Sequence, residues 1–139
     1  MIGIEAAAMC LALNMYHEAR GEGVQAMMAV AEVTINRVQD SYFPDTVCDV
    51  VYQGRKDSSG NMIRNQCQFS WYCDGKSDKM HDEKMKTVAH EVAIDYLTGL
   101  ETNLTGGATF YHATYVNPYW ASSFTKTTQI ESHIFYRKD

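Results

Sequence analysis

Glu18 is the side chain best placed to do chemistry. Leu11 and Met15 lie on one face of a predicted helix, and the same spacing continues to Glu18, just before Gly21. A carboxyl group at the end of an apolar face is partly desolvated, which disfavours its charged form and raises its pKa. A carboxyl group that stays protonated near neutral pH is what a general acid for glycosidic cleavage requires. The alternative is that the helix ends earlier and that Glu18 is solvated.

A second acid, Glu22, lies beyond Gly21, and Arg20 stands between the two acids in the sequence. We expect Glu22 either to pair with Arg20 or to cap the next helix, because a carboxylate suits both roles. Arg20 and Glu22 are therefore expected to support the site around Glu18 rather than to carry out the reaction.

The sequence offers little for other kinds of catalysis. His-Glu pairs occur at 17–18 and 90–91, but Gly21 and Ile94 occupy the positions where a zinc metalloprotease needs its second His. No Gly-x-Ser-x-Gly segment marks a serine nucleophile, and no Cys lies in a recognisable electropositive setting. We therefore expect neither a catalytic metal ion nor a cofactor.

The four cysteines permit three pairings, and no Cys-x-x-Cys motif is present. A domain stabilised by zinc bound to all four thiolates is one alternative, although the spacing is wide for such a site. Cys10 and Cys48 lie on apolar segments and are expected as reduced core thiols, whereas Cys67 and Cys73 are close enough in sequence to bridge locally. An oxidising destination would suit one or two disulfides.

Aromatic residues gather in two segments, and each segment also contains polar side chains. A groove of aromatic, amide and hydroxyl groups suits sugars, which present apolar ring faces and rim hydroxyls, but ordinary core packing would use the same aromatic residues. His112 or His133 could act as a base, although a His in an aromatic segment is more often structural. The aromatic residues are Phe69, Trp71, Tyr72, Tyr111, Tyr115, Tyr119 and Trp120, and the polar ones are Gln68, Ser70, His112 and Asn117.

The composition indicates one ordinary folded domain over residues 1–139, with 45% hydrophobic and 21% charged residues. A net charge of −5 argues against nucleic acid as the partner, which usually requires a basic surface. No run of 18 apolar residues is present, so we expect no membrane insertion. The N-terminal segment has Glu5 and no Lys or Arg before its apolar stretch, unlike a signal peptide. We expect a monomer.

The pattern of apolar residues, caps and turn residues predicts a mostly helical α+β domain with a small β-hairpin element. Long helices are expected over 4–19, 23–39 and 82–99, and a short helix is expected after Asp45 or Thr46 as N-cap. Residues 55–66 are typical of an exposed hairpin tip or flexible loop, 66–73 of a strand or extended segment, and 108–137 of irregular chain with one antiparallel hairpin.

The chain resembles the bacterial cell-wall hydrolase family typified by the spore cortex-lytic enzymes. The segments that carry the resemblance occur in the family's order over nearly the whole chain, and the first and fourth are the most specific. They are Tyr16-His17-Glu18-Ala19-Arg20-Gly21-Glu22, then Ala29-Val30-Ala31 with Asn36-Arg37-Val38, then 43–44 with 47–53, Cys67-Gln68-Phe69-Ser70-Trp71, and finally 107–112, 118–120 and 133–136.

The resemblance implies a compact fold like that of lysozyme and the lytic transglycosylases, with peptidoglycan as partner and Glu18 as general acid and base. It implies cleavage of the β-1,4 bond between N-acetylmuramic acid and N-acetylglucosamine, forming 1,6-anhydromuramic ends. We expect substrate-binding roles for Gln68, Phe69, Ser70, Trp71, Tyr111, His112 and Trp120. A hydrolytic muramidase with a second acid such as Asp74 or Glu22, and a non-catalytic glycan-binding module, are the alternatives.

We expect the chain to differ from the spore enzymes, which have an export signal and often a separate wall-binding domain, because the sequence shows neither. A chain that consists of a catalytic domain alone resembles a phage endolysin, which is made in the cytoplasm and released through a membrane pore to act on the cell wall.

Overall fold

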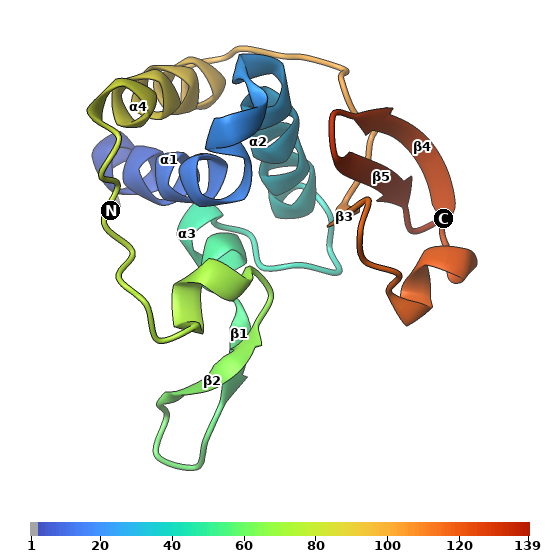
Figure 1. Ribbon diagram of the computed structural model, residues 1–139, viewed down its shortest axis with the longest axis horizontal. Helices are drawn as coiled ribbons and strands as arrows, with labels where there is room; N and C mark the ends of the chain where they lie inside the picture. Colours follow the sequence, from blue (N-terminus) through green and yellow to red (C-terminus); the bar gives the residue numbers. More distant parts are fainter. Residues whose placement is uncertain (1–2) are drawn as a thin grey trace.

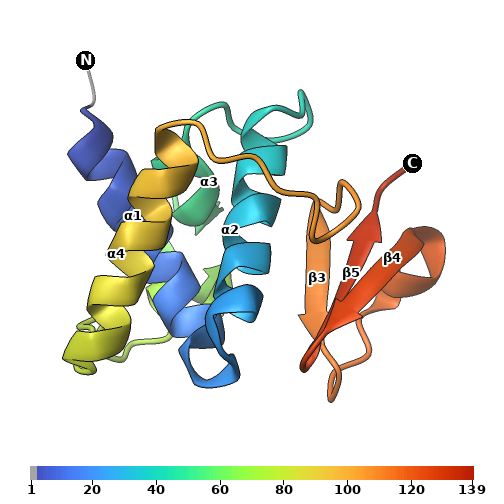
Figure 2. The same cartoon turned by 90° about the horizontal axis from the view of Figure 1, so that it is seen from above.

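The structure is a computed structural model that describes residues 3–139, and it is built from a helical layer and a small sheet (Figures 1 and 2). The helical layer holds α1 (Ile4–Ala19), α2 (Val24–Val38) and α4 (Glu83–Leu97), with a short helix α3 (Val47–Val51) packed against α1. The sheet lies on the far side of α2 from α1 and α4 (Figure 2). The mostly helical α+β fold predicted from the sequence is confirmed.

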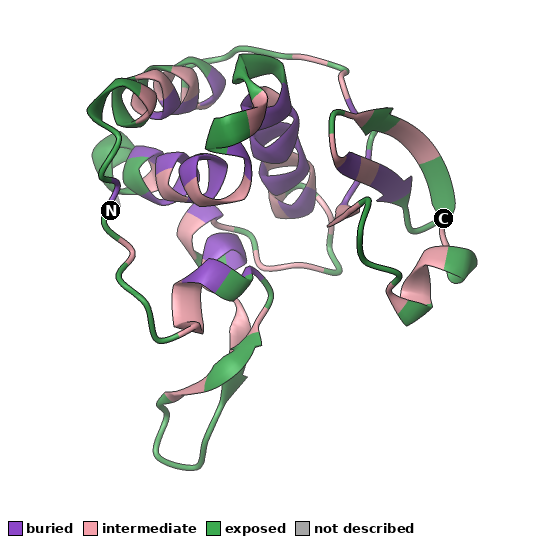
Figure 3. Ribbon diagram, in the orientation of Figure 1, coloured by how far each residue is buried: buried purple, intermediate pink, exposed green. Residues whose placement is uncertain are grey.

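The three long helices form within one or two residues of the bounds predicted from the sequence. The helix α1 is rich in Ala, Leu and Met, which are strong helix formers, and Ala8, Leu11 and Met15 are buried along it. The buried residues of α1 and α2 lie on the faces that these helices turn towards their neighbours (Figure 3). Among residues 3–139, no helix is both long and apolar enough to cross a membrane.

Side-chain caps fix the beginnings of α3 and α4. Thr46 accepts a hydrogen bond from the Asp49 amide at 3.1 Å, and Asp82 accepts one from the Met85 amide at 3.1 Å. These bonds satisfy amide groups that have no partner within the first turn of a helix. Thr46, one of the two residues predicted to cap the short helix, is therefore the N-cap.

A β-hairpin projects from the helical layer and carries the segment after it towards α1 (Figure 1). Its strands β1 (Gly54–Lys56) and β2 (Met62–Cys67) are antiparallel, and Asp57 at the tip accepts hydrogen bonds from the Ser59 and Asn61 amides. The predicted hairpin tip is thus confirmed. The prediction of one extended segment over 66–73 is wrong after Cys67, because residues 70–73 form the 3-10 turn η2 (Ser70–Cys73).

The C-terminal segment forms more regular structure than the single hairpin predicted from the sequence. The strands β3 (Phe110–Ala113), β4 (Thr125–Ile130) and β5 (His133–Arg137) make an antiparallel sheet in the order β3-β5-β4, and the 3-10 turn η3 (Tyr119–Ser123) precedes β4. The predicted hairpin is β4–β5. The third strand was missed because its partner β5 is distant in sequence.

The connection from α4 to β3 has no helix or strand and is held by a buried carboxylate. Glu32 on α2 is 4% exposed, and it accepts hydrogen bonds from the amides of Leu104 and Thr105 at 2.8 and 2.7 Å. The hydroxyl groups of Thr102 and Thr105 donate to the same carboxylate. Because each donor is satisfied, Glu32 anchors this connection to α2 and fixes the chain that leads into β3.

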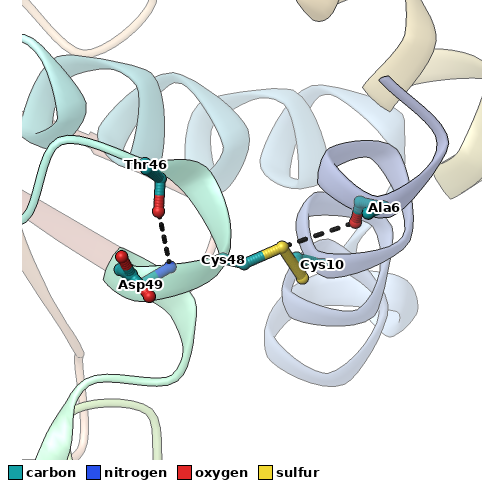
Figure 4. The surroundings of a disulfide bond; sticks show 5 residues. All are labelled: Ala6, Cys10, Thr46, Cys48 and Asp49. Carbon is teal, nitrogen blue, oxygen red and sulfur yellow. Dashed lines mark hydrogen bonds between the residues drawn. A yellow bond between two sulfur atoms is a disulfide. The ribbon is translucent and has the colours of Figure 1, made fainter. Parts of the chain in front are cut away.

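Two disulfides link segments of the helical half of the chain. Cys10 on α1 is bonded to Cys48 on α3, and Cys67 at the end of β2 is bonded to Cys73 in η2. The expectation of reduced core thiols at Cys10 and Cys48 is therefore wrong, whereas the local bridge between Cys67 and Cys73 is confirmed. The Cys48 sulfur lies 3.4 Å from the Ala6 carbonyl oxygen, which is a packing contact because a disulfide sulfur has no proton to donate. Figure 4 shows the Cys10–Cys48 bond and this contact.

Candidate active site

Glu18 lies in the last turn of α1 and lines a pocket of about 440 Å³ between the helical layer, the segment after β2 and the sheet. It is half-buried, as the apolar stripe of α1 predicted, and burial raises its pKa. The lining residues come from α1, from the segment between β2 and η2, and from β3 and the turns beside it. They are His17, Glu18, Gln68, Ser70, Tyr111, His112, Ala113, Tyr115, Val116 and His133.

The carboxylate of Glu18 is held by Tyr111 on β3. The Tyr111 hydroxyl donates a hydrogen bond to Glu18 Oε1 at 2.5 Å, and β3 places it there by pairing Tyr111 with Phe135 of β5. Burial, followed by the negative charge of Glu18, raises the pKa of Tyr111 well above its usual value, so the phenol keeps its proton. Tyr111 is therefore a permanent donor to Glu18.

A buried amide connects this pair to the core. Asn14, one turn before Glu18 on α1, is fully buried and accepts a hydrogen bond from Trp71 Nε1 at 2.9 Å. Asn14 Nδ2 makes no hydrogen bond among the described residues, and the effect of Asn14 in lowering the pKa of Tyr111 is outweighed by burial and Glu18. Trp71 in turn stacks on the ring of His17, with 4.8 Å between ring centroids. These contacts fix the orientation of the last two turns of α1.

Several charges oppose the effect of burial on Glu18. Desolvation has the largest effect and raises the pKa of Glu18. The hydrogen bond from Tyr111 lowers this pKa, and so do the charges of His133, Arg37 and His17, in that order. Desolvation outweighs them, so the pKa of Glu18 stays above its usual value. The carboxyl group is thus poised to hold a proton but to release it where a base is present. This balance is the behaviour expected of a general acid that later acts as a base.

Arg37 lies behind the site, although no sequence pattern indicated that it has a role there. Arg37 is 1% exposed, its Nε donates to the Thr109 carbonyl at 2.7 Å, and its guanidinium lies over the rings of Phe43 and Phe69. Burial lowers its pKa to about 10. The buried residues Val30 and Val33 of α2 continue to Arg37 at helical spacing, so the sequence pattern contained a signal for its burial but not for its contact with the site.

The residues predicted to bind substrate divide between the pocket and the core. Gln68 and Ser70 are exposed and line the pocket, whereas Phe69 and Trp71 alternate with them and are buried. Phe69 and Trp71 therefore lie behind the pocket rather than in its lining, and their roles in substrate binding stay predictions. Tyr111 lines the pocket as predicted.

His112 and Trp120 are both packed into the sheet side of the site. His112 lines the pocket, but its Nδ1 donates to the Ala113 carbonyl and its Nε2 accepts from the Tyr136 hydroxyl, both at 2.8 Å. Both ring nitrogens are thus occupied. Trp120 packs on Phe110 and other aromatic rings beside the sheet and is not among the residues that line this pocket, so its role in substrate binding stays a prediction.

Arg20 and Glu22 do not pair as expected. The Arg20 guanidinium lies over the ring of Tyr16 at 4.5 Å, and α2 begins at Gly23 without a side-chain cap. Glu22 instead accepts a hydrogen bond from the Ser132 amide at 2.8 Å, across the turn between β4 and β5. Burial raises the pKa of Glu22, but the hydrogen bonds from Ser132 and the charge of His133 outweigh burial and lower it.

Tyr111→Phe tests the electrostatic description of the site. Losing the donated hydrogen bond removes an interaction that favours the charged form, so the pKa of Glu18 should rise further. The measurement is a pH titration of the Glu18 side-chain carbon by NMR. Tyr115→Phe, which removes a hydroxyl from an exposed ring of the same pocket, should leave the titration unchanged. Equal titrations for Tyr111→Phe and the unmodified protein would contradict the assignment.

The comparisons with known proteins agree with one another. The family model described as Cell Wall Hydrolase matches residues 21–136. Curated relatives include the spore cortex-lytic enzymes of Oceanobacillus iheyensis and Halalkalibacterium halodurans, 29% and 30% identical over 126 residues. Both matches cover 90% of this chain but 39% and 33% of the relatives, so the chain spans between a third and two fifths of their length.

Two solved structures share the fold. The catalytic domain of the germination-specific lytic transglycosylase SleB from Bacillus anthracis has a TM-score of 0.71 and 26% identity, covering 94% of this chain and 93% of that one. The catalytic domain of the Bacillus cereus SleB protein has a TM-score of 0.69 and 26% identity, covering 99% and 94%. The lysozyme-like fold expected from the resemblance is thus confirmed.

Proposed function

The chain belongs to the cell wall hydrolase family of lytic enzymes, and we propose that it cleaves the β-1,4 bond between N-acetylmuramic acid and N-acetylglucosamine in peptidoglycan. The observation that carries this proposal is the half-buried carboxyl group of Glu18, with a raised pKa, in the wall of an open pocket. A single protonated carboxyl group beside a groove is what the first step of glycosidic cleavage requires.

In the first step Glu18 donates its proton to the glycosidic oxygen, and the bond between that oxygen and C1 of the muramic sugar breaks. The sugar becomes oxocarbenium-like, and the released chain carries the proton as a hydroxyl group. Glu18 is now a carboxylate, and the hydrogen bond from Tyr111 stabilises its negative charge. Tyr111 keeps its own proton throughout because its pKa is well above the usual value.

In the second step the 6-hydroxyl of the same muramic sugar attacks C1, and the Glu18 carboxylate takes the hydroxyl proton. This forms a 1,6-anhydro ring and returns Glu18 to its protonated state, so one carboxyl group serves both steps. Among the described residues that line the pocket, Glu18 is the one carboxylate. Hydrolysis usually requires a second acid. Glu22 lines a neighbouring pocket together with Glu18 but accepts a hydrogen bond from the β4–β5 turn, and Asp74 lines neither pocket.

Product masses test this proposal. Purified peptidoglycan digested with the protein should yield fragments with anhydro ends, lighter by one water, about 18 Da, than those of a parallel digest by a hydrolytic muramidase. Reducing muramic ends would establish hydrolysis instead and would require a second catalytic acid. Binding to the glycan without any cleavage would identify a glycan-binding module and overturn the proposal.

Tyr115 is proposed to form a stacking surface for sugar at the mouth of the pocket. Its ring is 85% exposed although it lines the pocket, which leaves an aromatic face free for an apolar sugar face. We expect Tyr115→Ala to raise KM for solubilised glycan strands by about tenfold, which corresponds to about 1.4 kcal/mol, and to change kcat little.

The control for this prediction is Tyr119→Ala. Tyr119 is 93% exposed in the same connection but does not line the pocket, so its loss should leave both KM and kcat unchanged. Tyr115→Phe should keep the low KM because the ring face is retained. Equal KM values for the two alanine variants would remove Tyr115 from the binding surface.

A further inference from the structure

His133 lies where the sheet meets the pocket. It is the first residue of β5, it is buried, and it is among the residues that line the pocket around Glu18. Its Nδ1 lies 3.4 Å from Glu22 Oε1 and makes no hydrogen bond. A buried imidazole nitrogen that faces a carboxylate without a formed hydrogen bond is poised for an ion pair whenever the ring is protonated.

Glu22 is held in place to serve as the partner. The Ser132 amide donates to Glu22 Oε1 at 2.8 Å, which attaches η1 (Arg20–Glu22) to the turn between β4 and β5. Although burial raises its pKa, the hydrogen bonds from Ser132 and the charge of His133 lower it overall, so Glu22 is a carboxylate at neutral pH. The negative charge is thus fixed beside the His133 ring.

His133 also contacts the group that holds Glu18. Its ring packs edge-on against Tyr111, with 5.3 Å between centroids and 67° between planes, and Tyr111 donates to Glu18. A positive charge on His133 lowers the pKa of Glu18 and opposes the effect of burial. The contacts therefore run from Glu22 through His133 and Tyr111 to Glu18.

Other titratable groups also face Glu18 and His133. Glu18 is faced by His17 from its own helix, by Arg37 from α2 and by Tyr111 from β3, in addition to His133 from β5. The strand neighbours of His133 are Ala113 and Ile130, which do not titrate, and Glu131 in the adjoining turn is exposed. Glu22 is therefore the carboxylate that bears most directly on His133.

We propose that Glu22 and His133 form a charge pair that controls the proton on Glu18, with His133 as a positioning residue that acts through space and through Tyr111. When the ring is protonated, its charge favours release of the Glu18 proton to substrate and stabilises the carboxylate that remains. Glu22 Oε1 faces Nδ1 of His133 and keeps the ring against Tyr111. This inference rests on the proposed function of Glu18 as the general acid.

The test follows the titration of Glu18 by NMR and, in parallel, the pH dependence of kcat/KM on solubilised glycan. We expect His133→Gln to raise the Glu18 midpoint by about one pH unit, since it removes a nearby positive charge. The alkaline limb of kcat/KM should move upward by the same amount, because the acid must be protonated to act. Glu131→Gln, which removes an exposed carboxylate from the same turn, should leave both unchanged.

Glu22→Gln distinguishes an effect of Glu22 through His133 from a direct effect of its charge on Glu18. If Glu22 acts through His133, its loss releases the ring from its place against Tyr111, its positive charge moves away from Glu18, and the Glu18 midpoint moves upward. If Glu22 acted on Glu18 directly, loss of its negative charge would move the midpoint downward, which would overturn the proposal. In the double variant His133→Gln/Glu22→Gln, the midpoint should move no further than in His133→Gln alone.

The two readouts keep this inference distinct from the proposed function. Shifted Glu18 midpoints in a protein that cleaves no glycan would support the charge pair and reject the function. Normal cleavage by Glu18 with unshifted midpoints in both single variants would support the function and overturn the charge pair. Should His133→Gln fail to fold, Glu22→Gln still decides the question, because Gln keeps an acceptor for the Ser132 amide.

Discussion

Glu18→Gln is expected to lower kcat on peptidoglycan by about 10³- to 10⁴-fold, the upper part of the range for loss of a general acid. The amide cannot donate a proton to the glycosidic oxygen or accept one from the attacking hydroxyl, so both steps are affected. Its carbonyl oxygen can still accept the hydrogen bond from Tyr111, which preserves the local structure. Release of soluble fragments from purified cell walls measures the loss.

The same variant should be more stable than the unmodified protein at neutral pH. Because burial raises the pKa of Glu18, the folded state binds the proton more tightly than the unfolded state, and stability falls as pH rises above the ordinary glutamate pKa of 4.5. The neutral amide in Glu18→Gln carries no such penalty. The variant and the unmodified protein should therefore differ less in their free energy of unfolding below pH 4.5 than at neutral pH. Glu91→Gln, an exposed change on α4, is the control for the stability measurement.

Full activity on peptidoglycan in Glu18→Gln would reject Glu18 as the general acid.

Loss of the Cys10–Cys48 disulfide is expected to have the largest effect on stability. The bond joins residues separated by 38 positions, and its loss in Cys10→Ala/Cys48→Ala should lower the free energy of unfolding by about 4 kcal/mol on the chain-entropy account. The Cys67–Cys73 bond joins residues separated by only 6 positions, for which the same account gives about 2 kcal/mol. Urea unfolding monitored by fluorescence provides both values.

For activity the order should be reversed: loss of the Cys67–Cys73 bond should affect substrate binding more than loss of the Cys10–Cys48 bond. Gln68 and Ser70 lie between Cys67 and Cys73 and line the pocket, whereas Cys10 and Cys48 join helices away from it. Cys67→Ala/Cys73→Ala should therefore raise KM under conditions in which the protein remains folded, and Cys10→Ala/Cys48→Ala should not. Equal KM values for the two double variants would contradict this division.

Local sequence signals were sufficient for the helices and for Glu18. The spacing of Leu11 and Met15 depends on helix geometry alone, and it extends to Glu18 without knowledge of any other element. Caps are similarly local, so the sequence narrowed the cap of the short helix to Asp45 or Thr46 and placed Asp82 at the start of the third long helix. These features were predictable because each is decided within a few residues.

The remaining parts of the site depend on contacts between distant segments. Tyr111 meets Glu18 across 93 positions and Ser132 meets Glu22 across 110, and neither pairing leaves a periodic signal in the sequence. The aromatic residues show the same difficulty, since Trp120 and Tyr115 are equally suited to core and groove. Only the packing of the sheet shows that Trp120 lies against Phe110 and that Tyr115 is free.

The tip of the β1–β2 hairpin offers a place to engineer the protein. Ser58 and Ser59 are exposed at the end of the projecting hairpin, and the turn is closed by backbone and Asp57 contacts rather than by the core (Figure 1). Exposed loop tips of this kind tolerate inserted sequence well. A short epitope or a fluorophore attachment site between Ser58 and Ser59 would therefore report the position of the protein on a cell wall without altering the pocket.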